Sequence, residues 1–433
     1  MKKICVVGLG YIGLPTAAIF ALSGHQVIGV DINEKVVEKL NKGEVHIEEP
    51  GLDKVVKMMV DTGKIIARTS PEESDVFIIA VPTPNKNDKY KSCDLSYVLS
   101  AVKSIIPYIK NGDVIIVEST IAPRTTDDFI KPIIEEAGFK VGQDVYLAHC
   151  PERVLPGKIM EELVENNRIV GGCTPKCAEK AAEVYRNFVK GEILITDAKT
   201  AEMSKLMENT FRDVNIALAN ELVKVCNSLD INALEVIRLA NKHPRVNLHQ
   251  PGPGVGGHCL AVDPYFIIEK APELARIISL ARETNNSMPH YVVSKVKQMT
   301  SDIKDPKIAI LGITYKGNID DMRESPALEV IELLKEEGFE VAIHDPHVNT
   351  DVLELVSLNK AVRKADMILI LADHNEFKTI DYNELAKEMR TPLVFDTKNI
   401  INIKDYTSGK VEIRNLGNVH DVKMSVEEIE KAI

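Results

Sequence analysis

Three glycines near the start of the chain constrain its fold most strongly. Gly8, Gly10 and Gly13 form the pattern GxGxxG, directly after the apolar run at residues 3–7 and directly before a helix-like stretch. Gly8 permits a tight turn, Gly10 lets the backbone approach a pyrophosphate, and Gly13 lets the helix pack closely on the strand. Free N–H groups at the start of such a helix bind phosphate oxygens. The pattern predicts a strand–turn–helix unit that binds a dinucleotide. The alternative is a purely structural glycine-rich turn.

A carboxylate follows the second apolar run. Asp31 closes the stretch QVIGVD, at the distance from the glycines where a dinucleotide-binding domain places an acidic residue. A carboxylate there accepts hydrogen bonds from the ribose 2′-OH and repels the 2′-phosphate of NADP. The sequence therefore predicts NAD as the cofactor, although the nearby Lys35 weakens the exclusion of NADP slightly.

Short apolar runs alternate with helix-like stretches through the first part of the chain. The runs are KICVVGL, QVIGVDI, DVFIIAV, DVIIVEST and DVYLAHC. This alternation predicts an α/β domain with a doubly wound parallel sheet. Ligands of such sheets bind beyond the carboxyl ends of the strands. Thr83 and Thr120, which follow the third and fourth runs, are therefore candidate cofactor or substrate contacts, or else ordinary turn residues.

The middle of the chain is helical. Residues 200–229 contain neither Pro nor Gly and are expected to form one long helix, which is a candidate dimerisation surface. Asn232, with Glu235 three positions later, indicates the start of another helix.

A second α/β pattern begins at residue 307. It continues with a helix that starts at Ser325 and Pro326, and with the strands EVAIHD, ADMILIL and TPLVFDT. Only Gly312 stands where a GxGxxG pattern would begin, so this domain is expected to bind the nucleotide half of a sugar nucleotide rather than a second dinucleotide. The predicted fold is α/β: two Rossmann-like, doubly wound domains (1–198 and 303–433) joined by a central helical domain with a long helix (199–302).

One cysteine follows a stretch that cannot be a regular helix or strand. The run PGPGVGG at residues 251–257 is followed by His258 and Cys259, and Asp263 comes four residues later. A cysteine behind such a loop is a candidate nucleophile, which needs a cationic neighbour or a helix N-terminus to ionise. The alternative is a buried, inert cysteine.

Three polar residues share one face of the predicted long helix. Lys205, Asn209 and Arg212 are spaced i, i+4 and i+7. Such a face would stabilise a thiolate or an oxyanion, or it is simply solvated.

Composition excludes several classes of protein. The net charge of −11 and the pI near 5.6 do not suit nucleic acid or an anionic membrane as a partner. No apolar stretch is long enough to span a membrane, so the cytoplasm is expected. The seven cysteines show no disulfide framework, and Cys173 and Cys177 have no second Cys/His pair that would complete a metal site, so no metal is expected.

Together these motifs resemble those of the UDP-glucose/GDP-mannose dehydrogenase family. The likeness covers nearly the whole chain and comprises VVGLGYIGLP, GVDIN, VPTP, EST, CPERVLPG, the Lys205/Asn209 helix, GPGVGGHC and LGITYKGNIDDMRESP. The stretches GEVHIEEP, TAEMSKLMENTFRDVNIALANEL and RLANKHPRVN are most similar to the branch of the family that acts on UDP-N-acetyl-D-mannosamine.

The resemblance implies a four-electron oxidation that uses two NAD per sugar. Hydride leaves C6 to give an aldehyde, Cys259 captures the aldehyde as a thiohemiacetal, and a second hydride transfer gives a thioester that water hydrolyses. The resemblance assigns Lys205 to proton transfer and oxyanion stabilisation, with Asn209 beside it. It assigns Asp263 to a role as base or water-orienting group, and Glu152 of CPERVLPG to assisting the chemistry.

The resemblance also implies two sets of binding residues and a homodimer or higher homo-oligomer. The cofactor set comprises Gly8, Gly10, Tyr11, Ile12, Gly13, Asp31, Thr83, Thr120 and Arg323. The set for the UDP-sugar comprises Arg153, Val154, Arg212, His243, Arg245, Gly256, Tyr315 and Lys316.

Two departures from the family pattern affect these expectations. Leu-Ala-Val-Asp follows Cys259, where enzymes for UDP-glucose carry Pro-Lys-Asp, and this counts against UDP-glucose. Gly317 replaces the usual proline after Lys316, which predicts a less fixed backbone at Tyr315 and Lys316. The alternatives are the same chemistry on UDP-N-acetylglucosamine or UDP-glucose, a two-electron dehydrogenase of the hydroxyacid type, and a non-catalytic sensor of nucleotide sugars.

Overall fold

The computed structural model describes residues 1–406 and 411–419. The chain forms two compact units, one of residues 1–208 and 265–272, the other of residues 209–264 and 273–433. The predicted last domain extends over 407–410 and 420–433, which lie outside the described residues. Its boundary at 302/303 and the boundary at 198/199 stay predictions.

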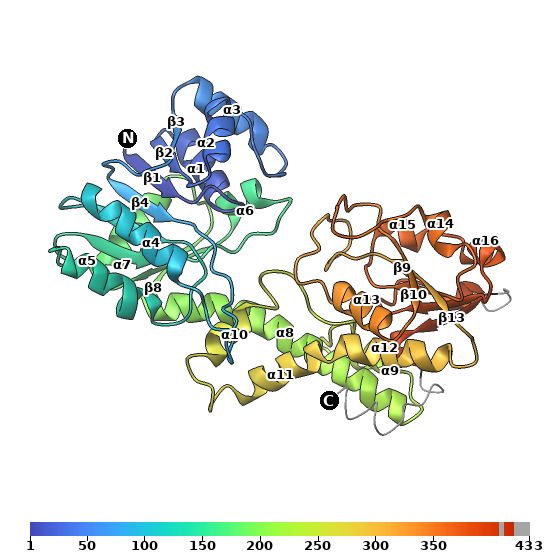
Figure 1. Cartoon of the computed structure of the whole chain (residues 1–433). Helices are drawn as coiled ribbons and strands as arrows, with labels where there is room; N and C mark the ends of the chain where they lie inside the picture. Colours follow the sequence, from blue (N-terminus) through green and yellow to red (C-terminus); the bar gives the residue numbers. More distant parts are fainter. Residues whose placement is uncertain (407–410, 420–433) are drawn as a thin grey trace. The chain divides into compact units, whose positions relative to one another are not determined.

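The first unit contains an eight-stranded sheet in the order β3-β2-β1-β4-β5-β6-β7-β8 (Figure 1). The strands are β1 (Lys3–Val7), β2 (Gln26–Val30), β3 (Ile65–Arg68), β4 (Val76–Ile79), β5 (Val114–Val117), β6 (Tyr146–His149), β7 (Arg168–Gly172) and β8 (Ile193–Asp197). The strand order changes direction at β1, which has β2 on one side and β4 on the other. Dinucleotides bind at this point in such sheets. The predicted Rossmann-like fold is confirmed.

The sheet departs from the sequence expectation in two ways. The apolar runs predict five strands, and β3, β7 and β8 are missed. The sheet is also not wholly parallel, because β7 runs antiparallel to β6, with Ala148 opposite Gly172. Of the missed strands, β7 begins with an arginine and ends with two glycines, whereas β3 (IIAR) and β8 (ILITD) carry apolar runs that are only three residues long.

Helices pack on this sheet. They are α1 (Gly13–Leu22), α2 (Glu34–Asn41), α3 (Leu52–Asp61), α4 (Ser96–Ile105), α5 (Lys131–Glu136), α6 (Ile159–Glu165) and α7 (Pro175–Tyr185). The helix α1 is apolar on all sides because it contacts β1 and β2 as well as α3 and α6, so nearly all of it is buried. The helix α7 contacts the strands from β5 to β8.

The middle of the chain is helical, as predicted. Its helices are α8 (Ala198–Ser228), α9 (Ala233–Ala240), α10 (Asp263–Ile268), α11 (Arg276–Asn286) and α12 (Met288–Met299). The long helix α8 matches the predicted one to within two residues at its start and one at its end. Asn232 caps α9 by accepting a hydrogen bond from the N–H of Glu235 at 3.2 Å, while the Glu235 carboxylate pairs with Arg238 instead of closing a capping box.

The second unit contains a five-stranded parallel sheet in the order β10-β9-β11-β12-β13 (Figure 1). Its strands are β9 (Lys307–Leu311), β10 (Glu340–His344), β11 (Met367–Ile370), β12 (Leu393–Asp396) and β13 (Glu412–Asn415), and its helices are α13 (Pro326–Glu336), α14 (Leu358–Val362), α15 (Asn375–Lys378) and α16 (Tyr382–Leu385). The sequence predicts the first four strands and misses β13, which reads EIRN. Ser325 caps α13, as predicted, by accepting from the N–H of Ala327.

Candidate active site

The predicted dinucleotide-binding turn has the geometry that the glycines require. Gly8 has a φ of +93°. A Cβ atom on Gly13 would lie 1.8 Å from the carbonyl oxygen of Gly8, so only glycine fits at the first residue of α1. A Cβ atom on Gly10 would meet nothing within 4 Å, which leaves its backbone accessible. The turn therefore fits the close approach of a pyrophosphate.

Asp31 lies beside this turn. Its Oδ2 accepts a hydrogen bond from the N–H of Leu9 at 3.1 Å, and its Oδ1 accepts one from the N–H of Asn33 at 2.9 Å. The carboxylate is only partly buried, and its position next to the glycine turn fits contact with an adenosine ribose. Tyr11, in the same turn, is 44% exposed.

The ends of β4 and β5 are joined through the two predicted threonines. The Oγ1 of Thr83 donates to the carbonyl oxygen of Thr120 at 2.6 Å. Ser119, which the sequence reasoning missed, adds a second link, because its Oγ accepts from the N–H of Val81 at 2.9 Å and donates to the carbonyl of the same residue at 2.7 Å. These loops lie at the carboxyl ends of neighbouring strands, as predicted.

Glu152 belongs to a buried ionic cluster. The Nη2 atom of Arg168 lies 2.7 Å from the Oε2 of Glu152 and 2.7 Å from the Oε1 of Glu118. The hydroxyl of Tyr185 donates to Glu118 at 2.6 Å, and the Arg168 guanidinium stacks on the Tyr185 ring at 4.0 Å from its centroid. Burial disfavours the charged form of Arg168, but the two carboxylates outweigh this and raise its pKa.

This cluster fixes the position of Glu152 through a residue that the sequence reasoning missed. Arg168 is the first residue of β7, and Glu118 directly follows β5. A charged residue at the border of an apolar strand was the only available signal. The other oxygen of Glu152, Oε1, accepts from the N–H of Arg153 at 2.8 Å.

Three further predicted residues of the first unit are Lys205, Arg153 and Val154. Lys205 is 7% exposed on α8, close enough to His149 that its charge contributes to lowering the pKa of that histidine. Arg153 donates to Glu208 at 2.8 Å. Val154 packs in a small apolar cluster with Ile159.

In the second unit, two predicted catalytic residues are joined directly. The Nδ2 of Asn209 donates to the Oδ2 of Asp263 at 2.6 Å, and Arg212 donates to the Oδ1 of Asn209 at 3.0 Å. Asp263 is 2% exposed. The amide of Asn209 is therefore held at both of its polar atoms, in a fixed orientation.

The glycine-rich loop packs tightly against the protein. A Cβ atom on Gly256 would lie 2.3 Å from the carbonyl oxygen of Glu324, and one on Gly257 would lie 2.8 Å from the Tyr315 ring. Both glycines therefore approach the segment 315–326 closely.

The start of the loop is held by side-chain amides. The N–H of Gly252 donates to the Oδ1 of Asn220 on α8 at 2.9 Å, and the Nδ2 of Asn220 donates to Asn285 on α11 at 2.9 Å. The Nδ2 of Asn399, after β12, donates to the carbonyl of Pro251 at 3.3 Å. The loop is thus anchored on both helical and sheet elements, and sequence reasoning found none of these anchors.

Cys259 lies in the turn directly before α10 and is partly exposed. Its carbonyl oxygen accepts from the N–H of Asp263 at 2.9 Å, so the backbone itself links the two residues. All seven cysteines lie in the described part of the chain, and none forms a disulfide. A partly exposed cysteine is accessible to a substrate, whereas an inert core cysteine would be buried.

Arg323 lies beside the cysteine loop. Its guanidinium binds Asp321 with both Nε and Nη2, at 2.9 and 2.7 Å, and lies 3.4 Å from the Nδ1 of His258. His243 and Arg245 are exposed in the turn after α9, where the Arg245 N–H donates to His243 at 3.3 Å. Their predicted roles, like that of the exposed Lys316, stay predictions.

The expectation that Gly317 leaves its backbone less fixed is wrong. Its N–H donates to the Oδ1 of Asp373 at 3.0 Å, a bond that a proline cannot make. A Cβ atom there would lie 2.4 Å from the Asp373 carbonyl oxygen. Glycine therefore permits both the close approach and the hydrogen bond, which hold this backbone in place.

Three models of one protein family match the chain. The NAD binding domain of the UDP-glucose/GDP-mannose dehydrogenase family matches residues 2–189, its central domain matches residues 199–287, and its UDP binding domain matches residues 309–403. The chain belongs to the UDP-glucose/GDP-mannose dehydrogenase family. The resemblance inferred from the motifs is confirmed, and so are NAD as cofactor and a nucleotide-binding last domain.

Relatives in this family are similar over nearly their whole length. A UDP-N-acetyl-D-mannosamine dehydrogenase from Methanococcus vannielii is 50% identical over 427 residues, 96% of this chain and 97% of that protein. A solved structure of a UDP-N-acetyl-mannosamine dehydrogenase from S. aureus has a TM-score of 0.90 and 57% identity, over 97% of this chain and 100% of the other. An NDP-N-acetyl-D-galactosaminuronic acid dehydrogenase from Ralstonia nicotianae is 46% identical, over 93% of this chain and 97% of that protein.

Within residues 1–406 and 411–419, no helix is both long enough and apolar enough to cross a membrane.

Proposed function

We propose that this chain oxidises C6 of UDP-N-acetyl-D-mannosamine to a carboxylate with two NAD. The observation that carries the proposal is the partly exposed Cys259, whose backbone is linked to the buried Asp263, which in turn pairs with the half-buried Asn209. The relatives from M. vannielii and S. aureus, which carry the name of this activity, support the choice of sugar.

The reaction balances around one sulfur atom. The alcohol loses a hydride and a proton to give an aldehyde, and the thiolate of Cys259 adds to its carbon to give a thiohemiacetal. Loss of a second hydride and of the hydroxyl proton gives a thioester, and water releases the uronate and regenerates the thiol. NAD bound at the Gly8–Gly13 turn supplies the hydride acceptor.

Each proposed catalytic residue has a distinct task. Lys205 is proposed to take part in proton transfer and to stabilise the oxyanion. Asn209 is proposed to donate a hydrogen bond, and Asp263 orients it and the hydrolytic water. Glu152, held by Arg168, is proposed to assist the proton transfers.

The proposed binding residues fall into two sets. Tyr11, Ile12, Asp31, Thr83, Thr120 and Arg323 contact NAD in this proposal. The UDP-sugar is held by Arg153, Val154, Arg212, His243, Arg245, Gly256, Tyr315 and Lys316. Arg245 or His243 is the proposed partner of the acetamido carbonyl, since a site built around such a bond rejects sugars that lack the group.

The test is to count NADH per sugar over a panel of UDP-sugars. UDP-N-acetylmannosamine should give about two NADH per sugar, with clear preference over UDP-N-acetylglucosamine and UDP-glucose. Cys259→Ser should reduce acid formation by roughly 100-fold or more while NAD and UDP still bind, because an ester intermediate forms and breaks far more slowly than a thioester. Acid formation by this variant at near wild-type rate would remove Cys259 from the mechanism.

A second candidate sugar is an N-acetylgalactosamine nucleotide. The 46% identity to the Ralstonia relative favours it over other epimers as the alternative. The panel therefore includes UDP-N-acetylgalactosamine. Faster turnover of this sugar than of UDP-N-acetylmannosamine would replace the proposed substrate and leave the chemistry intact.

A further inference from the structure

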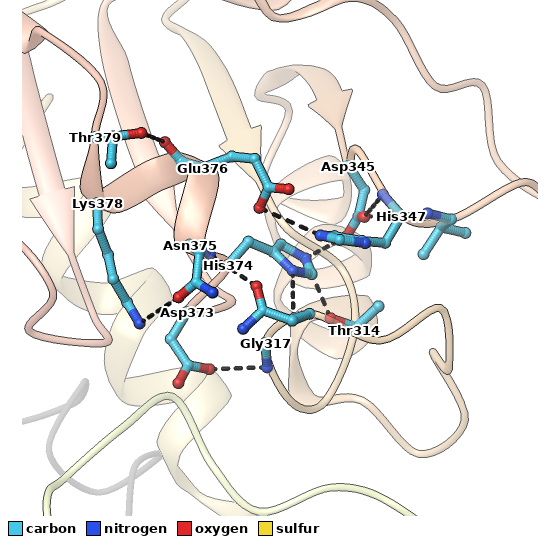
Figure 2. Close-up of polar contacts among 12 residues, drawn as sticks. Thr314, Gly317, Asp345, His347, Asp373, His374, Asn375, Glu376, Lys378 and Thr379 are labelled. Atoms are coloured by element: carbon cyan, nitrogen blue, oxygen red, sulfur yellow. Dashed lines mark hydrogen bonds and ion pairs between the residues drawn. The ribbon is translucent and has the colours of Figure 1, made fainter. Parts of the chain in front are cut away.

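The loop after β9 is held at its backbone from two neighbouring strand ends (Figure 2). The N–H of Ile313 donates to the Oδ2 of Asp345, after β10, at 2.8 Å. After β11, Asp373 accepts from the N–H of Gly317 at 3.0 Å, and the Nδ1 of His374 accepts from the N–H of Asn318 at 2.9 Å. Three side chains therefore fix both ends of the loop at residues 313–318, which carries Tyr315 and Lys316.

These contacts determine the tautomer of His374. Because its Nδ1 accepts from a backbone N–H, its Nε2 carries the proton. Nε2 lies 3.1 Å from the Oδ2 of Asp345 and 3.3 Å from the Oγ1 of Thr314. Burial opposes the charged form of Asp345, but the hydrogen bonds from His374 and from backbone N–H groups outweigh it and lower the pKa of Asp345. The fully buried His374 thus connects one end of the loop to the other.

The same histidine lies in a group with metal-binding potential. His347, His374 and Glu376 bring one ligand atom each within 4.8 Å of one another. A metal on the Nε2 of His374 would require the proton to move to Nδ1, where it would face the N–H of Asn318 at 2.9 Å, donor against donor. The hydrogen bonds of this cluster therefore favour a role in holding the loop over a metal site.

The loop itself is shaped for these contacts. Asn318 has a φ of +61°, a conformation that asparagine tolerates better than most residues. Its Oδ1 accepts from the N–H of Asn375, at the start of α15, at 2.9 Å. The hydroxyl of Thr314 donates to the carbonyl of Lys316 at 2.8 Å, which closes the loop on itself.

We propose that Asp345, Asp373 and His374 are positioning residues that hold the loop 313–318 in the conformation that binds the uridine diphosphate part of the substrate. The proposal rests on the proposed function, in which Tyr315 and Lys316 hold the UDP-sugar. We call Asp345, Asp373 and His374 together the clamp. A loop that is fixed before binding loses less conformational entropy on binding, so the clamp raises nucleotide affinity without touching the reacting carbon.

The first test is the affinity of the full chain for UDP, measured by titration calorimetry. Asp373→Ala and His374→Phe each remove an acceptor for a loop N–H, and each should weaken UDP binding by about ten-fold or more. The KM for the UDP-sugar should rise by a similar factor, with a smaller change in kcat.

Two variants serve as matched controls. Asp373→Asn keeps an oxygen that accepts from Gly317 and should restore UDP binding to within about two-fold of wild type. His347→Phe makes the same substitution in the ring next to His374, at 4.6 Å between centroids, without removing a loop contact, and should also bind UDP normally. Normal UDP binding by folded Asp373→Ala would overturn the proposal, and so would equal losses in Asp373→Asn and Asp373→Ala. Asp373 is partly exposed, so this pair stays informative even where His374→Phe does not fold.

Amide hydrogen exchange separates the clamp from the proposed function. The N–H groups of Gly317 and Asn318 should exchange faster in Asp373→Ala than in wild type, in the absence of any nucleotide. Unchanged exchange overturns the clamp. Faster exchange together with a wild-type chain that does not bind UDP supports the clamp and overturns the proposed nucleotide site.

Discussion

Burial acts differently on two basic side chains of the first unit. Arg168 keeps its charge because two carboxylates surround its guanidinium. His149, at the end of β6, is equally buried but faces Lys205 rather than a carboxylate. Burial, with a smaller contribution from Lys205, lowers the pKa of His149 from 6.5 to about 3. Arg168 is thus stable as a cation, and His149 is stable only as a neutral ring.

His149 should make the first unit sensitive to acid. Below pH 6.5 the unfolded chain binds a proton at this histidine while the folded chain does not, so stability is lost as the pH falls from 6.5 toward 3. At pH 5.5 the loss is about 1.4 kcal/mol relative to pH 7.5. His149→Gln should remove this part of the pH dependence, as measured by urea unfolding at the two pH values.

The exposed His290 provides the control for this prediction. His290→Gln removes a ring at the surface, so it should change the pH dependence of unfolding less than His149→Gln does. An equal effect of the two substitutions would contradict the assignment to burial.

Single functional residues were predictable where they belong to a short sequence motif. Asp31 follows the first glycine motif at a meaningful spacing and lies beside the glycine turn. Cys259 follows a glycine-rich run that predicts irregular structure, and it lies in a turn. The partners that hold the site were not predictable. Arg168 and Glu118 are 50 residues apart, and only the pairing of β5 to β7 through β6 brings them together.

At the scale of elements, the cysteine loop should tolerate a side chain only at those glycines that do not closely approach other groups. Gly256→Ala places a methyl group 2.3 Å from the Glu324 carbonyl oxygen, so the loop must move. Such overpacking costs about 1–3 kcal/mol. We expect kcat/KM to fall by about ten-fold or more, because Cys259 lies three residues further along the same loop.

Gly252→Ala is the matched control in that loop. Its Cβ would meet only the flexible end of Lys398, at 3.9 Å, and its backbone N–H stays available to Asn220. Its melting temperature and kcat/KM should therefore stay close to wild type. Equal damage by both substitutions would show that the loop tolerates no added side chain anywhere, and that close approach to Glu324 is not the cause.

Elements were predictable in proportion to the length and apolar character of their segments. The helix α8 and the strands that open each domain carry unmistakable periodicity. The strand β7 escaped detection because two of its five residues are glycines, and β13 because EIRN contains only one apolar residue. The antiparallel direction of β7 relative to β6 has no signal in the local sequence, because it depends on how the strand joins the edge of the sheet.

At the scale of the whole molecule, α8 exposes an apolar stripe in the second unit. Phe211, Leu218 and Val225 are 62%, 50% and 47% exposed and recur every seven residues, so they lie on one face of the helix. Exposed apolar side chains in such a row indicate a protein–protein contact. We propose a second copy of this chain as the partner, because most soluble oligomers are homo-oligomers and the two-fold dimer is the commonest of them.

The dimer is tested by placing charges on this stripe. Phe211→Glu with Leu218→Glu sets two carboxylates against their own copies across a two-fold axis, where desolvation and like-charge repulsion oppose association. The double variant should be monomeric by light scattering at a concentration where wild type is a dimer or a larger assembly. Val352→Glu makes the same type of change at a residue that is 80% exposed in the last domain, and it should keep the wild-type mass. A monomeric wild type would contradict the proposed dimer, and an unchanged mass in the folded double variant would place the interface elsewhere.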